Sequence, residues 1–320
     1  MRSFTRRDDP NAAPPSALSR ACFLRLLAGA GLALGVGPGG AAAAASTITR
    51  AIPKSGETLS VVGLGTWQTF DVGPSPAERA SQLEVLRLLL DGGGSVIDSS
   101  PMYGRSETVV GDLLAELQAH ERAFLATKVW TRGAEAGIRQ MEQSLARMRS
   151  PQIDLMQVHN LVDWRIHLPT LRRWREEGRI RYIGITHYTT AGLDALAEVI
   201  EAEPLDFVQL AYSIGVREAE NRLLPLAAER DVAVLINRPY QGGGLFRAVR
   251  GQGLPDWAAD FDCASWGQFF LKFILSHPAV TCVIPGTSKA KHMADNLGAG
   301  RGRLPDRAQR KRMLAHWQSL

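Results

Sequence analysis

After residue 50, this chain of 320 residues alternates short apolar runs with amphipathic stretches of helical period, and it does so eight times. Each apolar run has the length of a strand and is followed by a predicted helix. Strands that alternate with helices pair in parallel, and eight such units close a (β/α)8 barrel, or TIM barrel. The pattern predicts an α/β fold in one domain, residues 46–320, with strands at residues 61–65, 95–98, 123–128, 153–159, 180–185, 207–210, 232–236 and 280–284.

Helices are predicted between the strands, at residues 76–91, 106–117, 134–148, 168–177, 190–200, 218–230, 265–276 and 289–297. Two further segments lie outside this repeat. Residues 48–61 alternate weakly around a Lys-Ser-Gly-Glu turn, which predicts an N-terminal hairpin that covers the bottom of the barrel. Residues 306–318 predict an extra C-terminal helix packed outside the barrel.

A doubly wound open sheet is the rival architecture. It requires a Gly-x-Gly-x-x-Gly turn between the first strand and the first helix. Residues 63–68 read Gly-Leu-Gly-Thr-Trp-Gln and lack the third glycine. The sequence therefore favours the closed barrel.

Three consecutive predicted strands end in a polar residue. These residues are Asp98, Lys128 and His159, and Tyr103 follows Asp98 by five positions. The carboxyl ends of barrel strands meet at one face, where barrel enzymes carry their catalytic groups. Asp98 and Lys128 alone could form a structural ion pair, and Tyr103 could be a loop aromatic that covers the core. The convergence of all four is harder to explain by packing, and it predicts a catalytic site.

These residues and their neighbours resemble the catalytic tetrad of the aldo-keto reductases. The similar segments occur in the family's order: Gly-Leu-Gly-Thr-Trp (63–67), Ile-Asp-Ser-Ser-Pro-Met-Tyr-Gly (97–104), Ala-Thr-Lys-Val-Trp (126–130) and Gln-Val-His-Asn (157–160). Later segments extend the resemblance over roughly residues 48–300. The resemblance implies an oxidoreductase that transfers hydride from a nicotinamide cofactor to an aldehyde or ketone.

The residue types suit this reaction. A carbonyl that accepts hydride becomes an alkoxide, so a proton donor must lie at its oxygen. We assign Tyr103 as this general acid; since free tyrosine has a pKa of about 10, we expect the Lys128 ammonium to lower that pKa. Asp98 would hold Lys128 charged and in place. His159 would donate a hydrogen bond to the substrate oxygen and orient the carbonyl.

The resemblance also implies the residues that hold the nicotinamide. Gly-Ile-Thr-His-Tyr (184–188) stands where the family has Gly-Val-Ser-Asn-Phe, so Thr186 and His187 would replace the Ser and Asn that bind the carboxamide. Gln209 should bond the same carboxamide. Tyr212 should stack on the nicotinamide ring; the alternative is an aromatic that only packs the barrel mouth. The other residues placed at this end of the cofactor are Gly65, Thr66, Trp67 and Asp98.

Two later segments are expected at the cofactor phosphates. Ile-Asn-Arg-Pro-Tyr (236–240) replaces the family's Ser-Pro-Leu stretch, and Arg238, beside Pro239, could pair with a phosphate or with an acidic neighbour. Ile-Pro-Gly-Thr-Ser-Lys (284–289) opens the eighth helix and resembles the adenosine-phosphate segment. A 2′-phosphate contact there favours NADPH, with NADH possible, although Lys289 could also be an exposed helix residue. The residues expected in this segment are Gly286, Ser288, Lys289, His292 and Asn296, the last at the adenine.

Aromatic residues are expected to line an apolar mouth over the tetrad, which suggests a hydrophobic carbonyl substrate. They are Trp67, Phe70, Trp130 and one of Trp164 and Trp257, and the predicted substrate contacts are Trp67, Tyr103, Trp130 and His159. Residues 241–261 form a predicted loop that shapes the entrance. No metal site is expected, because no cysteine pair has ligand spacing; Cys263 and Cys282 could form a disulfide in an oxidising compartment.

The first 45 residues have the layout of an export signal. Scattered arginines precede or interrupt an apolar stretch at residues 26–36, and residues 41–45 offer a small-residue cleavage site. The apolar stretch is too short for a membrane span, which needs about 20 residues. Ser-Arg-Ala-Cys-Phe-Leu-Arg (19–25) resembles a twin-arginine signal with Ala21 in place of the second arginine. We therefore expect export to the periplasm by that machinery; the alternative is a disordered extension of a cytoplasmic protein.

Basic residues gather near the C-terminus, where residues 286–320 hold eight Lys and Arg against two Asp. No aromatic residues are interleaved with them, which favours a cofactor-phosphate site and a solvated helix face over nucleic-acid binding. Free NADPH is not expected outside the cytoplasm, so two alternatives stay open. A permanently bound cofactor could shuttle hydride between substrates or serve an epimerisation, or the barrel could be a non-catalytic cofactor-binding or interaction module.

Overall fold

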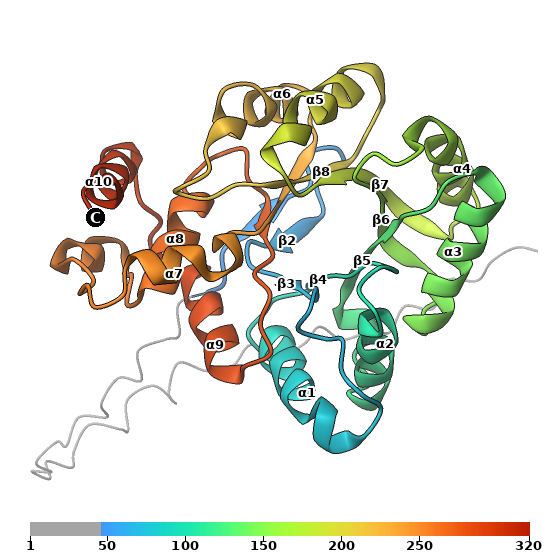
Figure 1. The fold of residues 1–320 in the computed structure, drawn as a ribbon, viewed down its shortest axis with the longest axis horizontal. Coiled ribbons are helices and arrows are strands. Elements are labelled where there is room, and N and C mark those ends of the chain that lie inside the picture. Colours follow the sequence, from blue (N-terminus) through green and yellow to red (C-terminus); the bar gives the residue numbers. More distant parts are fainter. Residues whose placement is uncertain (1–45) are drawn as a thin grey trace, which may run out of the picture. The chain divides into compact units, whose positions relative to one another are not determined.

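Eight parallel strands form a nearly closed barrel in the computed structural model, which describes residues 46–320 (Figure 1). They are β3 (Leu64–Gly65), β4 (Val96–Asp98), β5 (Phe124–Val129), β6 (Ile153–His159), β7 (Ile180–His187), β8 (Phe207–Ala211), β9 (Ala233–Asn237) and β10 (Cys282–Val283). Each strand pairs with its neighbours in the sequence. Parallel bridges from Val62 to Val283 and from Gly65 to Gly286 join the first strand to the last. The predicted (β/α)8 barrel is confirmed.

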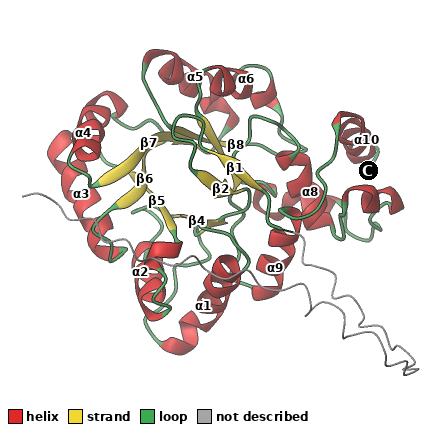
Figure 2. Cartoon of the chain, turned by 180° about the vertical axis from the view of Figure 1, so that it is seen from behind, coloured by secondary structure: helices red, strands yellow, loops and turns green. Residues whose placement is uncertain are grey.

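Helices surround the barrel (Figure 2). They are α1 (Pro76–Asp91), α2 (Ser106–Glu116), α3 (Ala134–Arg147), α4 (Trp164–Glu176), α5 (Leu193–Ala202), α6 (Leu223–Glu229), α8 (Trp266–Leu275) and α9 (Ala290–Ala299). The predicted C-terminal helix is α10 (Arg307–Gln318). The 3-10 turns are η2 (His120–Arg122), η3 (Thr190–Gly192), η4 (Glu218–Glu220), η5 (Gln241–Gly243) and η6 (Asp256–Phe261). Within residues 46–320, the helices are all too short or too polar to cross a membrane.

Among residues 46–320, side-chain N-caps begin α1, α8 and α10. α1 begins at a capping box in which the Ser75 hydroxyl accepts from the Glu78 N–H and the Glu78 carboxylate accepts from the Ser75 N–H. It ends at Gly92, as predicted. α4 begins at Trp164, four residues before the predicted start, so Pro169 lies inside the helix and not in its first turn. The predicted loop at residues 241–261 contains the short helix α7 (Gly244–Ala248).

The barrel interior is apolar at the bottom and polar at the top. Side chains at every second position of a strand point inward. On β5 these positions run from Phe124 to Lys128, and on β6 they run from Leu155 to His159. The predicted N-terminal hairpin, β1 (Thr49–Ala51) with β2 (Thr58–Ser60), adds Ile52 and Leu59 to the apolar cluster at the bottom. The hairpin thus closes that end, and the polar side chains gather at the other.

Helices α2 and α3 approach closely at Gly111. A Cβ atom added there would lie 2.2 Å from the carbonyl oxygen of Arg147 and 2.8 Å from the Cα of Met148. Both are backbone atoms, which cannot rotate away as the end of a side chain can. A glycine is therefore required at this contact.

We predict that Gly111→Ala lowers the free energy of unfolding by about 2 kcal/mol, because the added methyl forces the two helices apart. Gly253→Ala is the control, since no atom lies within 4 Å of its added Cβ. Urea unfolding of both variants measures the difference. Equal stability of the two variants would contradict the predicted contact.

Candidate active site

The inward positions at the top of the barrel carry most of the predicted catalytic residues. Asp98, Lys128 and His159 each occupy the last inward position of their strand, on β4, β5 and β6. Tyr103 lies on the loop after β4, whose turn is formed by a hydrogen bond from its own N–H to the carbonyl of Ser100 (3.0 Å). Strand register thus brings the four predicted residues together.

Lys128 and Asp98 form a buried ion pair. The Lys128 Nζ lies 2.7 Å from the Asp98 Oδ2 and also donates to the carbonyl oxygen of Ser99 (2.6 Å). Burial alone would lower the pKa of the Lys128 ammonium, but the charges of Asp98 and Tyr103 and the hydrogen bond to Asp98 outweigh it. The pKa of Lys128 is therefore raised, and the side chain is charged at neutral pH.

Tyr103 lies beside this pair. The Lys128 Nζ is 5.0 Å from the centroid of its ring. Burial raises the pKa of Tyr103, and although Lys128 lowers it as expected, the net pKa lies above the ordinary value. The effect of Lys128 thus has the predicted direction, but it does not lower the pKa of Tyr103 below the ordinary value. The reason is that removing the phenolate from water disfavours it more than the Lys128 charge favours it.

His159 is a neutral side chain near two aromatic rings. Its ring centroid is 6.0 Å from that of Tyr103, edge-on, and 6.1 Å from that of Trp130. Burial lowers the pKa of His159 to about 3, with smaller contributions from Lys128 and His187. Near neutral pH the imidazole can therefore donate or accept a hydrogen bond without carrying charge.

A second set of hydrogen bonds holds the other oxygen of Asp98. The Asp98 Oδ1 accepts from the Gln157 Nε2 (3.0 Å) and the Gln209 Nε2 (2.8 Å). Gln209 Nε2 also donates to the Gln157 Oε1 (3.2 Å), and its Oε1 accepts from Thr186 (3.1 Å) and from the Asn237 Nδ2 (3.2 Å). These contacts use all four hydrogen-bonding positions of the Gln209 amide. In this structure the predicted carboxamide ligands Gln209 and Thr186 thus bond to protein groups.

Two residues of this network, Gln157 and Asn237, were not predicted as site residues. Gln157 lies two residues before His159 on β6, so it shares the inward face, and Asn237 occupies the last inward position of β9. The period of two that places a strand's alternate side chains inward could have found both. The Asn237 Oδ1 is buried and has no hydrogen-bond partner among residues 46–320. It is an acceptor at the edge of the predicted nicotinamide site.

The prediction that Tyr212 stacks on the nicotinamide is wrong. Tyr212 is completely buried. Its ring packs near Phe273, which lies on α8, and near His277, which follows that helix. Its hydroxyl bonds to Glu220 and Arg310. Gln209 points inward on β8, so Tyr212, three positions later, has the opposite parity and points outward.

The rim holds the predicted residues His187 and Arg238. The Nδ1 of His187 accepts from the backbone N–H of Thr189 (3.3 Å), so its hydrogen is on Nε2. Arg238 is exposed, with a left-handed φ of 49°, and its guanidinium lies 5.8 Å from the Tyr188 ring. Within residues 46–320, no acidic side chain lies at ion-pair distance from Arg238, and its contact with a cofactor phosphate stays a prediction. The neighbouring Pro239 is buried.

The predicted adenosine-phosphate segment forms the start of α9. Gly286, Lys289 and His292 are exposed there and Ser288 is half-buried. Burial, Lys289 and Lys291 lower the pKa of His292. Asn296 is buried, and its side-chain oxygen accepts from the Tyr240 hydroxyl (2.6 Å).

The predicted residues in and after the first strand lie partly at the rim of the barrel and partly in its interior. Trp67 is 47% exposed and Trp130 is 41% exposed, as expected for an aromatic mouth. Thr66 is completely buried, and its hydroxyl contacts Asp98 O and Ser99 Oγ at 3.0 Å. Gly65 pairs with Gly286 where the barrel closes.

Two of the aromatics expected at the mouth lie elsewhere. Phe70 is fully buried in the core, and Trp257 packs against Phe261 and Phe269. An aromatic residue outside the barrel strands can face the core as readily as the mouth, because its position in the sequence does not fix the direction of its side chain. Trp164 is half-buried. Cys263 and Cys282 are both buried free thiols.

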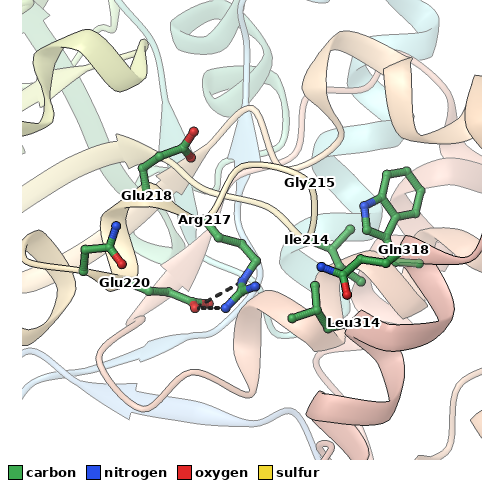
Figure 3. Close-up of a pocket in the computed structure, with 9 residues that line it drawn as sticks. Ile214, Gly215, Arg217, Glu218, Glu220, Leu314 and Gln318 are labelled. Carbon is green, nitrogen blue, oxygen red and sulfur yellow. Dashed lines mark hydrogen bonds and ion pairs between the residues drawn. The ribbon is translucent and has the colours of Figure 1, made fainter.

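A cavity of about 410 Å3 lies beside η4 and α10, and none of the tetrad residues lines it. Figure 3 shows Arg217 and Glu220 paired at its edge. Its lining residues are Ile214, Gly215, Arg217, Glu218, Glu220, Asn221, Leu314, Trp317 and Gln318.

Comparison with known proteins matches residues 61–312 to the Aldo/keto reductase family. The chain is 30% identical over 201 residues to the aldo-keto reductase YhdN of Bacillus subtilis, covering 58% of this chain and 60% of that protein. It is 28% identical over 255 residues to the methylglyoxal reductase YeaE of Escherichia coli, covering 77% of this chain and 88% of that one. An aldo/keto reductase from Klebsiella pneumoniae, solved with NADP and acetate, superimposes with a TM-score of 0.71 at 24% identity, covering 85% and 95% of the two chains. The chain therefore belongs to the aldo/keto reductase family, as its sequence motifs predicted.

Proposed function

We propose that this NAD(P)H-dependent oxidoreductase reduces an aldehyde or ketone to an alcohol, with NADPH as the favoured cofactor and Tyr103 as the proton donor. The observation that carries the proposal is the buried ion pair of Lys128 and Asp98, with Nζ 2.7 Å from Oδ2 and 5.0 Å from the Tyr103 ring. A non-catalytic barrel has no need of a charged lysine held in its interior beside a tyrosine.

A nicotinamide cofactor supplies the hydride in this chemistry. Tyr103 keeps its proton at neutral pH because its pKa is raised, and it gives the proton to the substrate oxygen as negative charge develops there. Lys128 stabilises the phenolate left behind, and Asp98 holds Lys128 in position. His159, neutral and adjacent, donates a hydrogen bond that orients the carbonyl.

The residues at the rim fit such a cofactor. The unpartnered Asn237 Oδ1 can accept from an amide N–H, and the His187 Nε2 carries a hydrogen that can be donated to an amide oxygen. At the start of α9, where the helix N-terminus favours a phosphate, the exposed Lys289 offers positive charge and the exposed His292 offers a ring N–H donor. The carboxamide would thus be held at the ends of β7 and β9, and the phosphate at the start of α9, which follows β10.

The substrate is proposed to be a small carbonyl compound with an apolar part. One relative of this chain is named a methylglyoxal reductase, which acts on a small carbonyl compound. The exposed rings of Trp67 and Trp130 would flank such a substrate, with Trp130 next to His159. A polar carbonyl end would face the tetrad and an apolar end would face these rings.

We expect Tyr103→Phe to lower kcat for methylglyoxal reduction by about 100-fold or more, because the proton donor is lost. NADPH binding, measured by fluorescence titration, should be unchanged. Tyr182→Phe is the control, since Tyr182 lies at the bottom of the barrel and bonds to Glu57. Unchanged turnover in Tyr103→Phe would exclude this mechanism, and absence of both turnover and cofactor binding in the native protein would favour the non-catalytic interpretation.

We expect Lys289→Ala to weaken NADPH binding about tenfold and to leave NADH binding within about twofold, because only NADPH has the 2′-phosphate. Lys311→Ala, on the exposed face of α10, is the control for a change in overall charge. Equal losses for the two cofactors would show that Lys289 does not contact the 2′-phosphate.

The export signal stays a proposal, and its residues lie outside the described part of the chain. A twin-arginine route carries folded proteins, so the cofactor could be exported with the enzyme. Replacing Arg6, Arg7 and Arg20 by lysine keeps the charge but removes the arginines that this route requires. We expect the full chain in the periplasmic fraction and the lysine variant in the cytoplasm, by immunoblot of cell fractions.

A chain that starts at Ser46 is the control for that experiment and should stay cytoplasmic. Export of the lysine variant would contradict the twin-arginine route, and a cytoplasmic native chain would contradict export altogether. NADP recovered with the periplasmic protein would favour the bound-cofactor shuttle or epimerase.

A further inference from the structure

The loop that carries Tyr103 also contacts His159 through Ser100. The Ser100 Oγ lies 3.1 Å from the Nδ1 of His159, and Ser100 is completely buried. The same Oγ accepts from the backbone N–H of Met102 (3.4 Å), within the turn that leads to Tyr103. Ser100 thus joins the loop after β4 to the end of β6.

The position of each hydrogen follows from the partners of this hydroxyl. A serine hydroxyl has one hydrogen to donate, and within residues 46–320 the structure provides it with one acceptor, the His159 Nδ1. If Nδ1 carried the hydrogen instead, the buried Ser100 hydrogen would have no acceptor, and a buried unpaired donor is unfavourable by about 1–3 kcal/mol. The arrangement that satisfies both groups has Ser100 donating to Nδ1.

This arrangement determines what His159 presents to the reaction. A neutral imidazole with an unprotonated Nδ1 carries its hydrogen on Nε2. The described residues offer Nε2 no hydrogen-bond partner, and the ring centroids of Tyr103 and Trp130 lie 6.0 Å and 6.1 Å from that of the imidazole. The Nε2–H is therefore available to an oxygen bound between the tetrad and the rim.

We infer that Ser100 is a positioning residue that fixes the tautomer of His159, so that Nε2–H faces the substrate carbonyl. The inference rests on the proposed function for its effect on catalysis, but the tautomer itself does not depend on turnover. Because Ser100 and Tyr103 share one turn, a single loop places the proton donor and sets the hydrogen-bond donor that orients the same oxygen.

Ring-nitrogen NMR of the full chain, labelled with 15N at histidine, tests the inference directly. Protonated and unprotonated imidazole nitrogens have well separated 15N shifts, and the His159 signals are assigned from their loss in His159→Asn. In the native protein we expect His159 to have a protonated Nε2 and an unprotonated Nδ1. In Ser100→Ala we expect part of the population to carry the hydrogen on Nδ1.

Ser99→Ala is the matched control, because Ser99 is an adjacent buried serine whose hydroxyl contacts Thr66 and not His159. It should leave the His159 tautomer unchanged. For the reaction, Ser100→Ala should lower kcat about fivefold, the effect of one neutral hydrogen bond, with the Kd for NADPH unchanged.

A native His159 protonated on Nδ1 would overturn the inference, and this result needs no variant to fold. An active enzyme in which Ser100→Ala changes neither the tautomer nor kcat would also overturn it. If the protein reduces no carbonyl but the tautomer shifts in Ser100→Ala and not in Ser99→Ala, the proposed function fails and the assignment of Ser100 to the His159 tautomer stands.

Discussion

The buried ion pair between Lys128 and Asp98 is the interaction on which the site depends. Two charges removed from water are tolerated only when each is fully provided with partners. Lys128 has the Asp98 carboxylate and a backbone carbonyl, while the other Asp98 oxygen has the amides of Gln157 and Gln209. These partners come from β4, β5, β6 and β8, so the pair exists only when half of the barrel is correctly assembled.

The sequence predicted the fold and the tetrad because both follow from local patterns. The alternation of apolar runs and helical periods gave the strands and helices, and α1 and β6 have the predicted bounds. Asp98, Lys128 and His159 were found because each stands where an apolar run ends. Parallel pairing then brings these residues together, since it places the carboxyl ends of neighbouring strands at one face.

The features of the site that could not be predicted from the sequence depend on the direction of individual side chains. Tyr212 was placed at the cofactor by resemblance, but it is out of phase with Gln209 on β8 and points to the helices. Gln157 was not predicted because a glutamine inside an apolar run does not by itself indicate a functional role. Its role depends on Asp98, which lies opposite it in the barrel. The net rise of the Tyr103 pKa likewise depends on burial, which a spacing pattern does not reveal.

The hairpin at the bottom of the barrel has a consequence for the supply of protons. Ile52 and Leu59 join the rings of Phe124, Tyr182 and Phe207 in an apolar cluster beneath the tetrad. Among residues 46–320, the side chains of this cluster are apolar except for the Tyr182 hydroxyl, which bonds to Ser55 and Glu57 in the hairpin, so they offer no row of polar groups leading up to the tetrad. In the proposed mechanism, each proton that Tyr103 gives up would therefore be replaced from the rim, so the opening that admits the substrate would also be the route by which Tyr103 is reprotonated.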